Sequence, residues 1–299
     1  MASPRWTADD LPDQSGRHIV ITGGNSGIGF EAARMLAGAG ARVTLAVRDT
    51  GRGDRAAAEI GGPVAVRELD LSKLDSVRAF VAATSEPIDV LVNNAGVMVP
   101  PFARTVDGFE IQFGTNHLGP FALTNLLLPQ ITDRVVTISS GAHRMGRIVL
   151  DDLNWERRSY RRWEAYGQSK VANLLFTLEL ERRLTAAGSP VRALAAHPGY
   201  SATNLQFHYG NPVVDRFMAV LNRVVGQSAA MGALPTVYAA TQDLPGASYV
   251  GPDGRNEMRG HPTLVGRSAV ASDLDLAERL WTASEELTGV RFPAGLTTS

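Results

Sequence analysis

Short apolar segments alternate along the chain with longer segments in which apolar residues recur at helical spacing. Apolar runs of this length are typical of buried parallel strands, and they cover residues 18–22, 41–47, 64–69, 88–92, 135–138 and 191–196. The helical spacing predicts helices over 31–40, 51–60, 73–84, 113–131 and 162–187. Because the alternation runs without a break in composition, we expect an α/β fold: a single-domain, Rossmann-type, doubly wound parallel sheet with helices on both faces.

The pattern changes after residue 199. Large apolar residues mix with glycine and proline over 200–226, further helices are predicted at 228–241 and 274–287, and a short strand is predicted near 248–250. We expect this C-terminal extension to bind the substrate, with 200–226 as a lid that closes over it. A helix pair packed on the sheet and a subunit interface are the alternatives for 200–226. One dinucleotide-binding and catalytic domain would then span 1–299, with an ordered core from about 16 to 290.

Composition narrows the class of protein. Hydrophobic residues make up 44% and charged residues 20% of the 299, which is enough to bury a full core. The formal net charge of −1 gives no electrostatic reason to expect nucleic acid or an anionic membrane as a partner. The chain has no cysteine and its histidines lack metal-ligand spacing, so no metal site is expected. Without a signal-peptide core or a membrane helix, we expect a cytoplasmic protein, either a monomer or a homo-oligomer.

A glycine-rich loop follows the first predicted strand directly. Gly23, Gly27 and Gly29 stand between this strand and the first predicted helix. In a strand–loop–helix unit, backbone N–H groups and the helix N-terminus form a cradle for a pyrophosphate. The spacing differs from the common G-x-G-x-x-G fingerprint, and glycines also serve ordinary tight turns. The position of the loop nevertheless favours dinucleotide binding.

Tyr166 and Lys170 form a pair with chemical meaning on the longest predicted helix. Lys170 is one of only two lysines among 29 basic residues, and it stands four residues after the tyrosine. Residues i and i+4 share a helix face, so the ammonium group can lower the pKa of the phenol toward neutrality. A phenol with such a pKa can exchange a proton with a substrate oxygen. A surface pair on an amphipathic helix is the alternative interpretation.

Several motifs occur in an order that resembles the short-chain dehydrogenase/reductase family, from about residue 16 to residue 290. They are the glycine loop, Asn93-Asn94-Ala95-Gly96, Ser140, and Tyr166 with Lys170. The strings Thr115-Asn116-His117-Leu118-Gly119, Asp151-Asp152-Leu153-Asn154 and Ala165-Tyr166-Gly167-Gln168-Ser169-Lys170 are similar to those of its retinol-dehydrogenase-like branch.

The resemblance implies catalytic roles for four residues. Tyr166 would be the general acid/base, and Lys170 would lower its pKa and bind the nicotinamide ribose. Ser140, the second serine of the pair that begins with Ser139, would bind the substrate carbonyl. Asn116 would hold a water molecule that links Lys170 to a proton path.

The resemblance also implies a cofactor groove. Asp70 would meet the adenine, Asn93 to Gly96 would line the groove, and Pro198, Gly199 and Thr203 would contact the nicotinamide carboxamide. The expected cofactor-binding residues are Gly23, Asn25, Ser26, Gly27, Ile28, Gly29, Arg48, Asp70, Leu71, Asn93, Ala95, Gly96, Tyr166, Lys170, Pro198, Gly199 and Thr203.

The end of the second strand predicts which cofactor is used. NAD enzymes place an acid there for the ribose 2′-hydroxyl. The resemblance to the family implies that this position is Val47, and Arg48 follows it. An arginine can pair with a 2′-phosphate and stack on adenine. Asp49 lies about 20 residues beyond the loop, where the ribose acid is usually found, and keeps NAD(H) as the alternative. The sequence therefore favours NADP(H).

Together these features predict an NADP(H)-dependent oxidoreductase. It would transfer hydride between the nicotinamide and a carbonyl or alcohol carbon of a lipophilic small molecule, namely an alcohol, aldehyde or ketone. Two alternatives are an NADP(H)-binding sensor without turnover and a reductase of a conjugated C=C bond. A sensor would not need the acid/base residues, but the sequence does not separate the two reductive chemistries.

Overall fold

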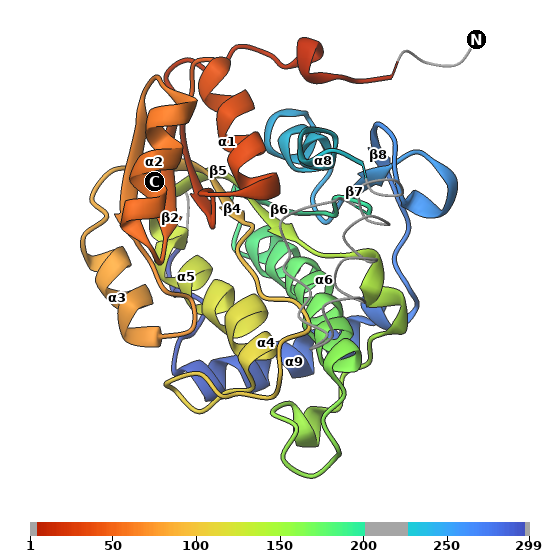
Figure 1. Ribbon diagram of the computed structural model, residues 1–299. Coiled ribbons are helices and arrows are strands. Elements are labelled where there is room, and N and C mark those ends of the chain that lie inside the picture. The colour runs from red at the N-terminus through yellow and green to blue at the C-terminus, as the bar shows by residue number, and fades with distance from the viewer. Residues whose placement is uncertain (1–4, 201–226, 297–299) are drawn as a thin grey trace.

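The computed structural model describes residues 5–200 and 227–296, which include an eight-stranded sheet (Figure 1). The strand order is β3-β2-β1-β4-β5-β6-β7-β8, and only β8 is antiparallel to its neighbour. The strands are β1 His18–Thr22, β2 Arg42–Val47, β3 Val64–Glu68, β4 Ile88–Asn93, β5 Ile131–Ile138, β6 Arg192–Ala196, β7 Tyr249–Pro252 and β8 Pro262–Leu264. The predicted Rossmann-type fold is confirmed.

Helices cover both faces of the sheet (Figure 1). They are α1 Gly27–Gly38, α2 Thr50–Ile60, α3 Leu74–Ala82, α4 Ile111–Phe113, α5 Gly119–Leu127, α6 Arg162–Ala186, α8 Ala229–Thr241 and α9 Leu274–Thr288. Alternate residues of β1 point to opposite faces, as a strand requires. Ile19 and Ile21 pack in a core with α1, α2 and α8, whereas Val20 packs in a second core with α3, α5 and α6. Helix α9 adds Trp281 to this second core.

The helix predicted over 113–131 is interrupted. After α4 the chain forms a π-helical turn at Gly114–Leu118, continues as α5, and then makes a 3-10 turn at Leu128–Gln130 before β5 begins. The glycines permit close contacts that a side chain would block, since a Cβ at Gly119 would clash with the Leu71 carbonyl. Pro129 lacks an N–H and ends the helical ladder, so Ile131 starts the strand instead of ending a helix.

Two further features differ from the prediction: the start of α1 and the presence of β8. Helix α1 begins at Gly27 rather than at residue 31, so two of the loop glycines belong to its first turn. Strand β8 is absent from the predicted elements, because a three-residue strand leaves almost no periodic pattern.

Thr203 and nearly all of the predicted lid, residues 201–226, lie outside the described residues. The lid and the role of Thr203 therefore stay predictions. Among residues 5–200 and 227–296, no helix is both long and apolar enough to cross a membrane.

Candidate active site

Many of the predicted site residues lie just after the carboxyl ends of four neighbouring strands. The glycine loop follows β1, Ala95 and Gly96 follow β4, Ser140 follows β5, and Pro198 and Gly199 follow β6. Because these strands are parallel, their carboxyl ends meet at one edge of the sheet. The strand order reverses at the β1–β4 junction, and ligands of open α/β sheets bind at such a switch point.

The glycine loop closes tightly onto the segment after β4. Gly23 has a positive φ of 68°, and a Cβ there would lie 2.9 Å from the Ala95 Cβ. At Gly29, in the first turn of α1, a Cβ would clash with the Asn94 amide. Ser26 is exposed at the start of α1 and its side chain makes no capping bond there. The loop thus brings bare backbone and a helix N-terminus to the switch point, which suits a pyrophosphate.

Thr22 and Asn94 tie these two segments together. The sequence predicted Asn94 only as part of the groove-lining segment Asn93 to Gly96, and it gave Thr22 no role. The Thr22 hydroxyl accepts from the backbone N–H groups of Asn94 at 3.0 Å and Ala95 at 2.9 Å. The Asn94 amide donates to the Thr22 carbonyl at 2.8 Å. A hydroxyl residue at the last strand position before a glycine loop is the signal that could have indicated this role.

Ser140 and Tyr166 face each other at the end of β5. Ser140 caps the 3-10 helix Gly141–Met145, and its hydroxyl is in hydrogen-bonding contact with the Tyr166 phenol. The neighbouring Ser139 is buried, and its hydroxyl donates instead to the Lys170 carbonyl at 2.9 Å. The structure therefore separates the two serines: one faces the phenol, and the other is committed to helix α6.

Lys170 lies one turn after Tyr166 on α6. Its Nζ is 5.6 Å from the centre of the Tyr166 ring and donates to the Ile138 carbonyl at 3.0 Å. Asn173 donates to the same carbonyl at 3.0 Å. A Cβ at Gly96 would lie 3.9 Å from this Nζ, so the segment after β4 passes beside the ammonium group.

Asn116 lies in the π-helical turn and joins α6 to the segment after β4. Its amide donates to the Val97 carbonyl at 2.9 Å and to the Ser169 hydroxyl at 3.0 Å. Its Oδ1 accepts from the Val97 N–H at 2.7 Å. Single π-turns often occur at functional sites, because they redirect one side chain without ending the helix. The structure thus brings the four predicted catalytic residues together near the end of β5: Asn116, Ser140, Tyr166 and Lys170.

The protonation of the pair differs from the expectation drawn from the sequence. Burial raises the pKa of Tyr166 to about 12, and the contact with Ser140 offsets this only in part. Burial lowers the pKa of Lys170 to about 8. The expectation that Lys170 brings the phenol pKa toward neutrality is wrong in this structure, because desolvation disfavours the charged form of each group.

The residues predicted for the adenine end of the groove lie in the segments after β2, β3 and β4. Asp70 is 9% exposed and its carboxylate accepts from the Ser72 N–H at 3.0 Å, while Leu71 is buried beside Gly119. The Asn93 amide donates to the Thr124 hydroxyl at 2.9 Å, which ties β4 to α5. Asn93 is therefore a buried link between β4 and α5, whereas Ala95 is partly exposed next to Gly23.

Val47, Arg48 and Asp49 have distinct environments at the end of β2. Val47 is buried, and Gly53 of α2 approaches it so closely that a Cβ there would lie 2.8 Å from its Cγ2. Asp49 caps α2 by accepting from the Arg52 N–H at 2.9 Å. Arg48 is exposed and its side chain makes no hydrogen bond or ion pair with another described residue. The arginine is thus the group left free to meet a ligand.

Pro198 and Gly199 form a turn after β6 that is held from several sides. Gly199 has a φ of 66°, and a Cβ there would lie 2.5 Å from the Met258 carbonyl. The Gln227 amide donates to the Pro198 carbonyl at 2.7 Å, and the Tyr200 N–H donates to the Met258 carbonyl at 2.7 Å. The turn lies at the same sheet edge as Ser140 because β5 and β6 are neighbours.

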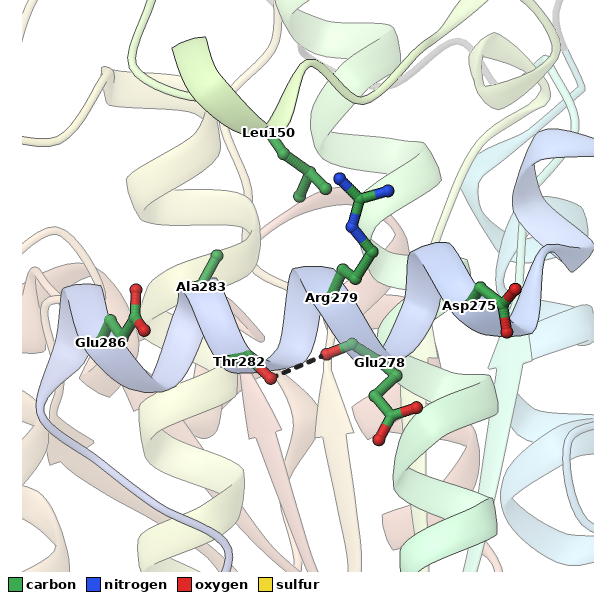
Figure 2. Close-up of a pocket in the computed structure, with 7 residues that line it drawn as sticks. All are labelled: Leu150, Asp275, Glu278, Arg279, Thr282, Ala283 and Glu286. Atoms are coloured by element: carbon green, nitrogen blue, oxygen red, sulfur yellow. Dashed lines mark hydrogen bonds between the residues drawn. The ribbon is translucent and has the colours of Figure 1, made fainter.

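A surface depression on α9 lies apart from this site. Figure 2 shows its lining residues, with the Thr282 hydroxyl bonded to the Glu278 carbonyl. The depression includes none of the predicted site residues. Its lining is mostly the exposed polar face of an amphipathic helix, and it is not part of the candidate active site.

A doubly wound sheet with a glycine loop after its first strand defines a Rossmann-type nucleotide-binding protein. The family model for short chain dehydrogenase matches residues 17–211, and the chain belongs to the short-chain dehydrogenase family. It is therefore an oxidoreductase of a family that uses NAD(P)(H). The residues present fit such a cofactor, because the tight approach of Gly23 and Gly29 to the segment after β4 leaves a side-chain-free cradle at the start of α1.

Curated relatives indicate the branch of the family. The chain is 40% identical to human retinol dehydrogenase 13 over 93% of its length and 86% of the relative. It is 41% identical to mouse retinol dehydrogenase 12, over 93% of this chain and 88% of the relative. A crystal structure of an uncharacterized protein from Mycobacterium paratuberculosis matches with a TM-score of 0.85 and 56% sequence identity. The match covers 97% of this chain and 100% of that chain. The chain is thus retinol-dehydrogenase-like.

Proposed function

We propose that this chain transfers hydride between NADP(H) and the carbonyl or alcohol carbon of a lipophilic small molecule, with Tyr166 as the general acid/base. The observation that carries the proposal is the assembly at the end of β5. The Ser140 hydroxyl meets the Tyr166 phenol, the Lys170 ammonium lies 5.6 Å from the phenol ring, and Asn116 holds the adjoining segment. A bound nicotinamide would supply or accept the hydride.

The protonation states suit the reduction of a carbonyl at neutral pH. With a pKa of about 12, Tyr166 is protonated and can donate its proton to the carbonyl oxygen. Ser140 can donate a second hydrogen bond to the same oxygen and so stabilise the negative charge that develops there. With a pKa of about 8, Lys170 is mostly cationic at pH 7 and adds a favourable charge nearby. In the direction of oxidation, Tyr166 would have to lose its proton first.

The environment of Arg48 supports NADP(H) as the preferred cofactor. The acid that competes for this role, Asp49, is engaged in capping α2 through the Arg52 N–H. An exposed guanidinium without a partner among the described residues can pair with a 2′-phosphate in bidentate fashion. The 2′-hydroxyl of NAD(H) carries no negative charge with which the Arg48 guanidinium could pair.

Three apolar side chains near the site support a lipophilic substrate. Trp163 is 42% exposed and its ring lies 6.3 Å from that of Tyr166, edge to face. Met145 ends the 3-10 helix that follows Ser140, and Met258 adjoins the turn at Gly199; they are 57% and 40% exposed. The relatives are named for retinol, an apolar alcohol. The cytoplasmic location and the assembly state stay predictions from the sequence.

A substrate panel tests the proposal. Purified protein would be mixed with NADPH or NADH and with apolar aldehydes, apolar ketones and conjugated enones, and both cofactor oxidation and product mass would be followed. We expect reduction of the C=O bond and a preference for NADPH. Reduction of the C=C bond would assign the other reductive chemistry, and tight NADPH binding without turnover of any compound would indicate a sensor.

A further inference from the structure

The side chain of His197, which follows β6, is held in a single tautomer by its two hydrogen-bond partners. His197 Nδ1 accepts from the Gly199 N–H at 3.2 Å, and its Nε2 lies 3.1 Å from Glu257 Oε2. A backbone N–H can only donate, so Nδ1 must be the nitrogen without a proton. Nε2 therefore carries the proton and donates it to Glu257. The carboxylate and the turn together select one tautomer of His197.

The ring of His197 is confined to this position. The side chain is 1% exposed, and its Nε2 occupies the space that a side chain at Gly251 of β7 would fill. The ring of Tyr249 lies 5.1 Å away on the same strand. Because the ring has no room to turn over, a change of tautomer would leave the Gly199 N–H facing a second donor.

Glu257 uses its second oxygen to reach the segment that carries Ser140. Its Oε1 accepts from the Arg144 guanidinium at 2.6 Å. Arg144 lies in the 3-10 helix that Ser140 caps, and its neighbour His143 contacts the Ser140 carbonyl through Nδ1 at 2.7 Å. One carboxylate thus joins the turn after β6 to the helix after β5.

The backbone of Glu257 is strained. Its φ is 56°, in the left-handed region that non-glycine residues rarely adopt. Such strain persists only when the surrounding contacts require it. The bond to His197 and the charge of Arg144 hold the pKa of the Glu257 carboxyl below its usual range, so the residue is charged at neutral pH.

We propose that Glu257 is a positioning residue for hydride transfer, which fixes His197 in the Nε2–H tautomer and couples the turn at Pro198 and Gly199 to the Ser140 helix. The proposal rests on the proposed function, in which Ser140 binds the substrate carbonyl, and on the role that the family resemblance implies for this turn, contact with the nicotinamide. Glu257 acts through these residues and does not itself touch the reacting atoms.

The test compares Glu257→Leu and Glu257→Gln with the wild-type enzyme. The imidazole ¹⁵N signals of His197 report the tautomer directly, and NADPH titration reports cofactor affinity. In Glu257→Leu we expect a mixture of tautomers and cofactor binding weakened about tenfold, the size of one lost charge-assisted hydrogen bond. In Glu257→Gln the amide oxygen can still accept from Nε2–H, so the tautomer and most of the affinity should be retained.

Two further variants separate the halves of the proposal. Arg144→Gln leaves His197 its acceptor, so we expect an unchanged tautomer and cofactor affinity but a several-fold lower kcat. Asp243→Asn removes a carboxylate from the exposed ion pair with Arg192, 2.6 Å long, and should change none of these quantities. It serves as the matched control for loss of an ion pair.

The outcomes are distinguishable from failure of the proposed function. If Glu257→Leu keeps the Nε2–H tautomer and binds NADPH within twofold of the wild type, the positioning role is overturned. Equal losses in Glu257→Leu and Glu257→Gln would also contradict it, since glutamine keeps the acceptor oxygen for His197 and leucine does not. If the wild-type enzyme reduces no carbonyl compound, the proposed function fails, and the tautomer and NADPH titration still decide the role of Glu257.

Discussion

The Lys170 ammonium lies 5.6 Å from the centre of the Tyr166 ring and donates to the carbonyl of Ile138, the last residue of β5. The lysine is therefore held by the sheet and not by the phenol. This arrangement places a cation beside the phenol without a direct bond, so both groups stay available to a ligand. It also explains why burial, more than charge, decides their pKa values.

Replacing Tyr166 with phenylalanine should lower kcat/KM by 10²–10⁴-fold, as is usual for loss of an acid/base group. NADPH affinity should stay nearly unchanged, because the hydroxyl acts in the transition state. Steady-state kinetics and a cofactor titration measure the two effects. A variant with more than about a tenth of wild-type kcat/KM would remove Tyr166 from its assigned role.

The rate of carbonyl reduction should depend on the charge of Lys170. Its pKa is lowered to about 8, so the cation is present below that pH and is lost as the pH rises through it. We expect kcat/KM for reduction to be constant from about pH 6 to pH 7.5 and to fall above pH 8. Lys170→Arg should be strongly impaired, because a guanidinium does not fit where a compact ammonium donates to Ile138. An active arginine variant, or a flat profile to pH 9.5, would contradict this.

Ser140→Ala should reduce kcat by about 10²–10³-fold, the usual effect of removing one donor to a developing oxyanion. Ser139→Ala is the matched variant, since the Ser139 hydroxyl donates to the Lys170 carbonyl and is not the serine that contacts Tyr166. We expect it to lower the free energy of unfolding by about 1 kcal/mol and to reduce kcat less than Ser140→Ala does. The reverse order of the two effects on kcat would show that the serines were assigned wrongly.

Replacing Arg48 with glutamine should weaken NADPH binding by about 1.5–3 kcal/mol and leave NADH binding nearly unchanged. The physical reason is that only NADPH carries the 2′-phosphate. Calorimetric titration with both cofactors measures the difference. Arg55→Gln, which removes an exposed arginine from the middle of α2, is the control. Equal losses for both cofactors in Arg48→Gln would mean that Arg48 does not recognise the phosphate.

His117 should make the protein sensitive to acid. It is fully buried among Phe113, Phe121 and Phe176, and burial lowers its pKa to about 3. Its pKa in the unfolded chain is about 6.5, so the unfolded state binds the proton first. Stability is therefore complete above pH 6.5 and falls as the pH drops toward 3, by at most about 1.4 kcal/mol per pH unit from this group.

Urea denaturation at pH 7, 5.5 and 4.5 tests the role of His117. The variant His117→Phe suits the aromatic surroundings and cannot take up a proton, so its stability should depend less on pH than that of the wild type. His261→Gln, at a partly exposed position, should keep the wild-type dependence. If His117→Phe loses stability with acid as steeply as the wild type does, another group is responsible.

The sequence by itself determined the parallel part of the sheet and singled out the residues that the fold gathers after β5. Continuous apolar strands, a glycine loop and a lysine four residues after a tyrosine depend on local spacing, which a chain carries without its fold. The Rossmann-type topology follows from the alternation of strands and helices, because parallel neighbours need a helical connection. The seven predicted strands are all present, although β5 begins earlier than predicted, directly after Pro129 and Gln130.

Only the tertiary structure decided the chemistry of those residues. The pKa of Tyr166 depends on how much water its neighbours exclude, and the burial comes from elements far apart in the chain. Likewise Glu257 meets His197 across 60 residues, and Asn94 meets Thr22 across 72. Such contacts leave no periodic signal, since each joins segments that only the fold brings together. Desolvation and long-range contact belong to the folded molecule, whereas the spacing of strands, glycines and the Tyr166–Lys170 pair is already in the chain.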